Sequence, residues 1–267
     1  MSKVVTVLSN ESMKLFPNNT IARFRNALDL QLDFSKNYQV CLHDISFTKS
    51  WFNFTRDETY TVTYSLGGAN PNERIIAPGY YEKKVFQDSA KNRTFQNGTF
   101  HSNQECSIGF DEPSHKFVIL FIRNQGKKKK GRPIEHDRVT LSADLSRKLG
   151  FGDKERTFDW DNGLDMQTYY SDHTIYFDPI DFFSVSTSLI KPTHNIGDQL
   201  YPCIAFVPST SGKHGARESY SPRDPIWFEL SREEIHQPEF ILTTINGDLM
   251  PFEFGPCSIT LLIREDA

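Results

Sequence analysis

The sequence predicts an all-β dominated fold, a β-sandwich or jelly roll interrupted by a small α+β module. The 267 residues include 22 Phe and 10 Tyr, and aromatic side chains favour strands. Short runs with a two-residue alternation are separated by turns rich in Pro, Gly and Asp, and no repeat period links them. This pattern favours a sandwich or jelly roll over a propeller or a solenoid.

The third observation is that the last stretch, "DLMPFEFGPCSITLLIREDA", is the most strand-like of the chain. Its residues alternate between an apolar side and a mainly polar side. The apolar side holds Cys257, Ile259, Leu261 and Ile263, the polar side holds Ser258, Thr260 and Arg264, and Leu262 is the apolar exception. Chain ends fray unless a sheet holds them. We therefore expect this strand to pair with strands from the beginning of the chain.

The beginning of the chain supplies candidate partners. Residues 4–8 form a short strand candidate and residues 15–20, "LFPNNT", a turn. Residues 21–34 fit either a helix through Phe24 and Leu28 or an extended strand through alternate leucines, and we favour the strand. The strand reading supplies one more partner for a sheet.

The stretch "YQVCLHDISF" predicts a strand with a β-bulge. Tyr38, Val40 and Leu42 alternate on one face, and the phase then slips by one residue so that Ile45 and Phe47 continue that face. A further strand, Thr59–Leu66, ends at a pair of glycines. We expect both strands in the sandwich.

Residues 75–158 read as the inserted α+β module. "APGYYEKKVFQDSAKN" predicts a helix through Tyr81, Val85 and Ala90, and "CSIGFDEPSHKFVILFI" a hairpin. "VTLSADLSRKLGFG" predicts a strand and a short helix, with Ser142 as N-cap and Gly150 as its left-handed stop. Residues 1–74 and 159–267 then form the sandwich, in which "HTIYFDP", "FFSVST", "QLYPCIAFVP", "PIWFEL" and "FILTTI" are strand candidates.

Composition narrows the function classes. A formal net charge of −4 argues against a surface built mainly to hold nucleic acid, so direct binding of a genome is not expected. No run reaches the ~18 apolar residues of a membrane span, and the N-terminus does not resemble a signal peptide. We expect a protein on the reducing side of a membrane with reduced, buried thiols at Cys41, Cys106, Cys203 and Cys257.

No motif predicts a catalytic, cofactor-binding or metal site. Residues 126–132, "GKKKKGR", lack the ending of a phosphate loop, and Pro133 follows where its helix should run. They fit a solvated loop, or else an exposed basic patch for nucleic acid or an acidic partner, formed by Lys127, Lys128, Lys129, Lys130 and Arg132. Residues 135–137, "EHD", alternate in direction on a strand and cannot share one ion. His173, between Asp172 and Asp178, has no accompanying nucleophile motif.

Aromatic side chains at strand ends are the remaining candidates. They could form a platform for sugars or bases, but packing in the core or in an interface between subunits is favoured. The residues concerned are Trp51, Phe52, Phe54, Trp227 and Phe228.

The order of the motifs resembles a known family, the penton-type minor capsid proteins of Polinton/Maverick elements and adintoviruses, which are similar to virophage and adenovirus vertex proteins. The matching stretches cover most of the chain, and "PFEFG" and "LSxxLGF" are the most specific. In order they are "FPNNTIARFRNALDLQLDFSKNYQVCLHDISF", "APGYY", "VTLSADLSRKLGF", "IGDQLYPCIAFVP" and "INGDLMPFEFGPCSITLLIR".

The resemblance implies a single jelly roll with an inserted domain that assembles as a homopentamer at the fivefold vertices of an icosahedral particle. It implies neighbouring copies and a double-jelly-roll major capsid protein as partners, a location in the virion after assembly in the host nucleus or cytoplasm, and no catalytic residues. Charge alone suggests a host surface polyanion as a further partner of the lysine loop. An N-terminal arm, residues 1–14, is a candidate for reaching a neighbouring subunit. The alternatives are a soluble lectin-like β-sandwich binding module and a hydrolase on a β-sandwich centred on His173.

Overall fold

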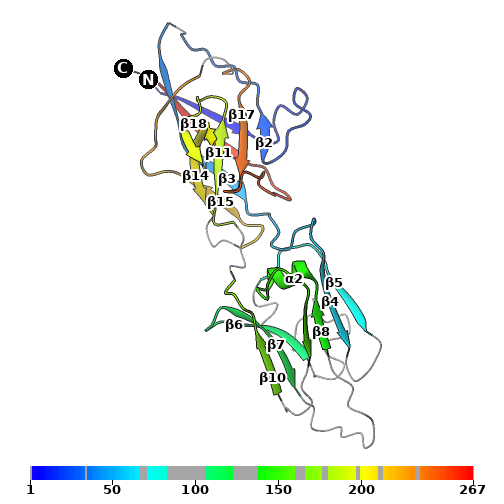
Figure 1. Ribbon diagram of the computed structural model, residues 1–267. Coiled ribbons are helices and arrows are strands. Elements are labelled where there is room, and N and C mark those ends of the chain that lie inside the picture. The colour runs from blue at the N-terminus through cyan, green and yellow to red at the C-terminus, as the bar shows by residue number, and fades with distance from the viewer. Residues whose placement is uncertain are drawn as a thin grey trace, which may run out of the picture. The chain divides into compact units, whose positions relative to one another are not determined.

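The computed structural model describes residues 2–33, 35–65, 71–82, 106–122, 138–159, 166–175, 180–196, 199–209, 213–231 and 235–266. The chain divides into two compact units, which are treated separately below (Figure 1). Unit 1 combines Met1–Trp51 with Ile180–Ala267, and unit 2 is Phe52–Pro179. Both ends of the chain therefore belong to one unit.

Unit 1 is a β-sandwich of two antiparallel sheets. Sheet A runs in the order β1 (Lys3–Leu8), β18 (Ser258–Glu265), β3 (Tyr38–Thr48) and β15 (Arg217–Tyr220), and β16 (Phe228–Glu229) also pairs with β3. Sheet B runs in the order β14 (Cys203–Pro208), β11 (Phe182–Thr187), β17 (Glu239–Thr243) and β2 (Arg23–Arg25). A hairpin of β12 (His194–Ile196) and β13 (Gln199–Tyr201) connects β11 to β14.

The connectivity of these strands is that of a jelly roll. When the main strands of the sandwich are counted along the chain, sheet A has the order 1-8-3-6 and sheet B the order 5-4-7-2. Successive strands thus alternate between the sheets, except that the fourth and the fifth, β11 and β14, are neighbours in sheet B, and this is the order of two interlocked Greek keys. Unit 2 is inserted between the third and the fourth of these strands, β3 and β11. The predicted fold class is confirmed.

The last strand, β18, lies between two strands from the beginning of the chain (Figure 1). Ile259 is opposite Val7 of β1 and Ile45 of β3, and all three side chains are buried. The inward face of β18 is the one that the alternation predicted, because Cys257, Ile259, Leu261 and Ile263 are buried in the core of unit 1. The expected pairing of the two chain ends is confirmed.

The predicted bulge in β3 is also present. Leu261 of β18 pairs with Leu42, whereas the preceding Thr260 pairs with Asp44, so that His43 is the extra residue. His43 is exposed, and Leu42 and Ile45 both reach the core. The slip in the hydrophobic phase is therefore the mark of a bulge that keeps both halves of the strand packed.

Aromatic side chains fill the core between sheets A and B. The rings of Phe47 in β3 and Phe183 in β11 meet edge to face at 5.0 Å, and those of Phe24 in β2 and Phe240 in β17 stack at 5.5 Å. All four are buried, and burial of one such side chain contributes about 1.5–3 kcal/mol. The high Phe content thus serves the core first.

Unit 2 contains two further antiparallel sheets and one described helix. The first sheet has the order β5 (Asn72–Ile76), β4 (Tyr60–Ser65), β8 (Arg138–Leu141) and β9 (Arg156–Asp159). The second has the order β10 (Met166–Tyr170), β7 (Lys116–Ile122) and β6 (Cys106–Asp111). Helix α2 (Ala143–Lys148) follows β8. Buried side chains of both sheets and of α2 form a second core, separate from that of unit 1.

The observed unit 2 extends beyond the expected module, 75–158, on both sides. Tyr60–Ser65 was expected in the sandwich, but β4 pairs with β5 and β8. Likewise β10 pairs with β7. Alternation identifies a strand but not the sheet that it joins, and this explains the difference.

Most local predictions hold in the described residues. The hairpin of β6 and β7 is present with its turn at residues 112–115, Ser142 caps α2, and Gly150 has φ +76°. In the predicted strand 21–34, the described residues 21–33 form only the short β2, after which Leu28, Leu30 and Leu32 pack on the core without a regular strand. The helix predicted through Val85 and Ala90 lies outside the described residues, and so does most of "HTIYFDP". No helix in the described part of the chain is both long and apolar enough to span a bilayer.

Candidate functional site

The chain passes from unit 1 to unit 2 through the segment Trp51–Phe54, which we call the crossing segment. Trp51 is fully buried in the core of unit 1 and Phe54 in the core of unit 2. Phe52 is half-buried, and the Arg56 guanidinium lies 5.7 Å from the centre of its ring. Trp51 and Phe54 therefore cannot contact another molecule directly, and a surface role for these two is wrong. Of the two favoured readings, packing in the core or in an interface between subunits, the structure shows packing in the core for Trp51 and Phe54.

The "PFEFG" stretch, residues 251–255, holds the start of the crossing segment. The ring of Phe252 lies 5.8 Å from that of Trp51 and meets it edge to face. The Ser50 Oγ accepts hydrogen bonds from the backbone N–H groups of Glu253 (3.2 Å) and Phe254 (3.3 Å). One side chain thus satisfies two backbone donors of the loop, and this fixes the loop over Trp51.

The glycine of this stretch is required by both its backbone and its neighbour. Gly255 has φ +85°, a conformation that side-chain-bearing residues rarely adopt. A Cβ at this position would lie 2.7 Å from the Cβ of Thr48, at the end of β3. The close approach between the loop and β3 therefore depends on the missing side chain.

Contacts of Lys49, the residue after β3, also hold the end of this strand in place. The side chain is only 2% exposed, and its ammonium lies 5.7 Å from the centre of the Trp51 ring, within the range of a cation–π contact. The backbone N–H of Lys49 donates to the carbonyl of Ala216 (3.0 Å), and its carbonyl accepts from Gly215 (2.7 Å). These contacts hold the backbone in place directly before Trp51.

The "APGYY" stretch, residues 77–81, holds the end of the crossing segment that belongs to unit 2. Phe54 and Gly79 exchange backbone hydrogen bonds of 3.0 and 2.9 Å. The buried Asn53 amide donates to the Tyr81 carbonyl (2.8 Å) and accepts from the Tyr81 N–H (2.9 Å). Two of the stretches that carry the family resemblance therefore anchor the two ends of the crossing segment.

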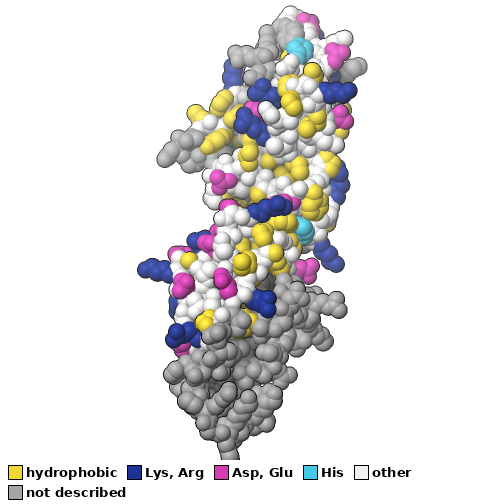
Figure 2. All heavy atoms as spheres, turned by 90° about the vertical axis from the view of Figure 1, so that its right-hand side faces the viewer, with side chains coloured by type: hydrophobic (Ala, Val, Ile, Leu, Met, Phe, Trp, Pro, Cys, Tyr) yellow, Lys and Arg dark blue, Asp and Glu magenta, His cyan; other side chains and the backbone are white. Residues whose placement is uncertain are grey.

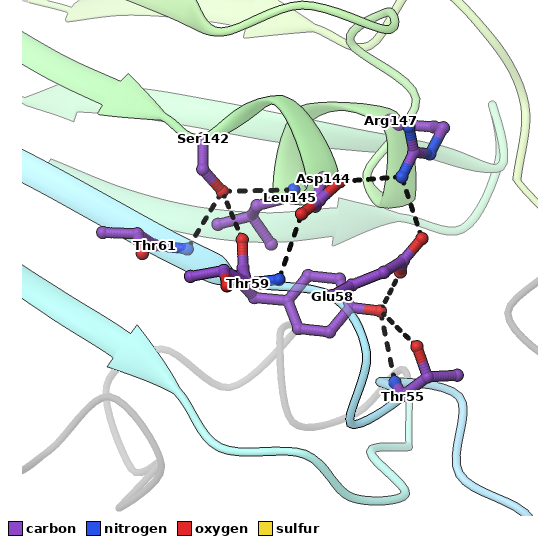
Figure 3. A network of polar contacts seen from close by, with 9 residues as sticks. Thr55, Glu58, Thr59, Thr61, Ser142, Asp144, Leu145 and Arg147 are labelled. Carbon is purple, nitrogen blue, oxygen red and sulfur yellow. Dashed lines mark hydrogen bonds and ion pairs between the residues drawn. The ribbon is translucent and has the colours of Figure 1, made fainter.

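Downstream of the crossing segment, a polar network ties residues 55–61 to helix α2 (Figure 3). The Ser142 Oγ accepts from the Thr61 N–H (3.0 Å) and donates to the Thr59 carbonyl (2.9 Å). Asp144 accepts from the Thr59 N–H (3.0 Å), and Arg147 bridges Glu58 and Asp144 at 2.8 Å each.

Tyr60 lies at the other end of this network. Its hydroxyl donates to Glu58 and accepts from the Thr55 N–H at 3.2 Å. Burial, reinforced by the bond to Glu58, raises the pKa of Tyr60 to about 12. The phenol is therefore neutral at ordinary pH and serves as a structural donor.

Trp227 and Phe228 lie on opposite faces of sheet A. Phe228 is 9% exposed, faces the core opposite Val40 and contacts the ring of His194 at 5.7 Å. Trp227 is half-buried, and the Arg264 guanidinium lies 3.9 Å from the centre of its ring. Of the aromatic residues predicted as interface candidates, Phe52 and Trp227 are partly exposed to solvent.

The outer face of sheet A carries an apolar patch, which we call patch A, formed by Val4, Leu262 and Trp227. Val4 is directly opposite Leu262 in the pairing of β1 with β18, and Leu262 is opposite Cys41 of β3. Val4 is 66% exposed, Leu262 and Trp227 are half-buried, and Cys41 beneath them is fully buried. Apolar side chains on the face turned away from the core therefore form a row across the sheet.

The outer face of sheet B carries a second one, patch B, formed by Phe182, Phe206 and Pro208. Phe182 pairs with Pro208 in the register of β11 and β14, and the rings of Phe182 and Phe206 meet edge to face at 6.1 Å. Their neighbours Phe183 and Val207 point into the core, so the patch residues point away from it. Phe182 and Phe206 are 39% and 42% exposed.

Patches A and B were not identified from the sequence, although a signal exists. Leu262 interrupts the polar side of its strand, Val4 is out of phase with the buried Val5 and Val7, and Phe182 precedes the buried Phe183. Apolar residues on the outward phase of neighbouring strands are the signal of such a patch. Figure 2 shows apolar side chains exposed among Lys and Arg side chains on one face of the molecule.

The catalytic candidates do not form a site in the described residues. The Asp172 carboxylate pairs with Arg156 (2.8 Å) rather than with His173, whose backbone N–H donates to Gly150. No cluster of three or more metal-ligating side chains occurs in the part of the chain that is described. Residues 135–137, Asp178 and the basic loop residues Lys127–Lys130 and Arg132 lie outside the described residues.

The described thiols are buried and free, as expected. Cys41, Cys203 and Cys257 form no disulfide, and nothing is described of the Cys106 side chain. Burial raises the pKa of all three thiols, that of Cys257 to about 12. These cysteines pack as small apolar side chains. Because their thiols stay protonated, they are poor nucleophiles.

Comparison with known proteins gives a likeness of fold to a solved structure. No protein-family model matches the chain, and no curated protein matches it. Among solved structures, the chain is similar to the crystal structure of the selenomethionine-labelled mavirus penton protein. The superposition covers 100% of both chains with a TM-score of 0.49 and 12% sequence identity.

Proposed function

We propose that the chain is a structural minor capsid protein, a penton, which forms a homopentamer at the fivefold vertices of an icosahedral particle. The observation that carries the proposal is the place of the resembling stretches in the fold. "PFEFG" and "APGYY" anchor the crossing segment at the point where an insertion leaves a jelly roll between its third and fourth strands. These stretches therefore specify the architecture that the family resemblance implies.

The surface of the sandwich supports an assembly role. A closed ring of identical copies needs two different contact surfaces on each copy, because each interface is heterologous. Unit 1 offers apolar patches on the outer faces of both sheets. In this reading the partners are neighbouring copies and a double-jelly-roll major capsid protein, and the protein resides in the virion.

The alternatives find less support in the described residues. A lectin-like module needs an aromatic platform beside carboxylates, but Trp51, Phe54 and Phe228 are buried. A hydrolase centred on His173 needs a carboxylate to orient the imidazole, but Asp172 is paired with Arg156. The prediction of an N-terminal arm over residues 1–14 is also corrected. Residues 3–8 form β1 of sheet A and are not a free extension. Beyond β1, the buried Ser9 Oγ accepts from the Cys257 N–H (2.9 Å) and the Ser12 Oγ accepts from the Ala27 N–H (3.2 Å), so these residues are also held within unit 1.

Electron microscopy of the protein co-expressed with a candidate double-jelly-roll capsid protein tests the proposal. We expect closed particles with density for this chain at the fivefold vertices. A matched co-expression without this chain should give particles with open vertices or no particles. Particles that form equally well without the chain and exclude it from their vertices would contradict the proposal.

A further inference from the structure

We infer that patch A of one copy binds patch B of the next copy, so that the sandwiches associate head to tail through the outer faces of their two sheets. This inference rests on the proposed function, because it names the surfaces by which the ring would close. The occupant of each patch is therefore a second copy of this chain.

The positions of the two patches argue for this occupant. Val4 and Leu262 point away from the core on sheet A, and Phe182 and Phe206 point away from it on sheet B. The patches thus lie on opposite sides of one sandwich. In a twofold contact, a patch of one copy would bind the same patch of a second copy. The other patch of both copies would then stay exposed to water. A rotational, head-to-tail contact covers both patches in every copy.

The chemistry of the patches is complementary. Patch A consists of the aliphatic side chains of Val4 and Leu262 and of the indole of Trp227. The guanidinium of Arg264 packs on this indole and holds it in place. Patch B presents the edges of two phenyl rings, a form that suits aromatic and aliphatic neighbours. Arg264 is the exposed cation on patch A, and the exposed carboxylate next to Phe182 in the chain is that of Asp181. At the rim of the contact, Arg264 of one copy can therefore form an ion pair with Asp181 of the next copy.

Two single variants and their mixture test the inference. Val4→Glu places a carboxylate in patch A, and Phe206→Glu places one in patch B. Both positions are exposed, so the fold should persist, and thermal unfolding followed by circular dichroism verifies this. Each variant alone should raise the concentration at which rings form by roughly tenfold or more, because a buried unpaired charge replaces an apolar contact. The matched control is Ile245→Asp, an exposed apolar residue of unit 1 outside both patches, which should form rings like the wild type.

An equimolar mixture of the two variants distinguishes the geometry. The Val4→Glu copy keeps patch B and the Phe206→Glu copy keeps patch A, so the mixture contains one intact pairing. It should give a one-to-one heterodimer in analytical ultracentrifugation, whereas neither variant should dimerise alone at the same concentration. Homodimers of one variant, or no heterodimer in the mixture, would overturn the head-to-tail pairing.

The same experiment separates this inference from the proposed function. Wild-type rings that both variants leave intact would overturn the assignment of the patches while ring formation itself stands. A wild type that stays monomeric at high concentration would overturn autonomous ring formation and the inference with it.

Discussion

Ile263, near the end of the last strand, lies directly opposite Val40 in β3, and both side chains are buried in the core of unit 1. These residues are more than two hundred positions apart in the chain. The sandwich therefore cannot form until both chain ends have come together, although the residues of unit 2 separate them in the sequence.

The first prediction concerns this pairing. Ile263→Ala should lower the free energy of unfolding by about 2–5 kcal/mol, because the fully enclosed side chain leaves a cavity. Leu262→Ala, the neighbour on the outer face of the same strand, should cost clearly less. Urea denaturation followed by Trp fluorescence measures both. Equal losses would show that β18 does not have one buried face.

The second prediction concerns the close approach at Gly255. Gly255→Ala and Gly247→Ala both place an alanine at φ near +85°, which costs about 1–2 kcal/mol. Only at Gly255 does the added Cβ collide with Thr48, whereas nothing lies within 4 Å at Gly247. Gly255→Ala should therefore be the more destabilising by about 1–3 kcal/mol in the same denaturation experiment. Indistinguishable variants would mean that the 251–255 loop does not pack against β3.

The third prediction concerns the clamp on the crossing segment. Asn53→Ala removes an amide that bonds both backbone groups of Tyr81 and leaves them without these partners. We expect a loss of about 1–3 kcal/mol per group left unsatisfied. The exposed Asn195→Ala serves as the control and should be near neutral. Hydrogen exchange of the Tyr81 amide should accelerate in Asn53→Ala alone, and unchanged protection would argue against the clamp.

The fourth prediction concerns the thiols. Because burial raises the pKa of Cys41, Cys203 and Cys257, they stay neutral at pH 8, and iodoacetamide should not alkylate them in the folded protein. Alkylation in urea, mapped by mass spectrometry, provides the positive control. A rapid reaction of native Cys257 would show that the last strand opens in solution.

The same pKa directions fix the sign of a pH dependence. An unfolded thiol ionises near a pKa of about 8.5, whereas folded Cys257 ionises at about 12. The stability that this thiol contributes is fully present below pH of about 8.5 and is lost as the pH rises toward 12. Cys257→Ser should flatten this decline when the free energy of unfolding is measured across this pH range.

The sequence was sufficient for features that leave a local mark. The phase slip between Leu42 and Ile45 predicted a bulge, which the structure places at His43, and the alternation of Ile259 and Ile263 predicted the inward face of β18. The N-cap at Ser142 and the stop at Gly150 follow from side-chain chemistry and backbone sterics alone.

The sequence was not sufficient where the outcome depends on partners distant in the chain. Tyr60–Ser65 has the same alternation whether it pairs in the sandwich or with β5 and β8, so the boundary of unit 2 was misplaced. Trp51 and Phe54 are aromatic residues at strand ends, which suit a core as well as an interface, and only the loops that close over them decide. Val4 and Leu262 become one patch only through the register of β1 with β18.

Multi-angle light scattering of the purified wild-type protein, eluted over a range of concentrations, tests the central claim of ring assembly most directly. We predict a species with five times the mass of the 30.8 kDa chain at high concentration. A mass that stays at that of one chain at every concentration, or that stops at two chains, would contradict the account.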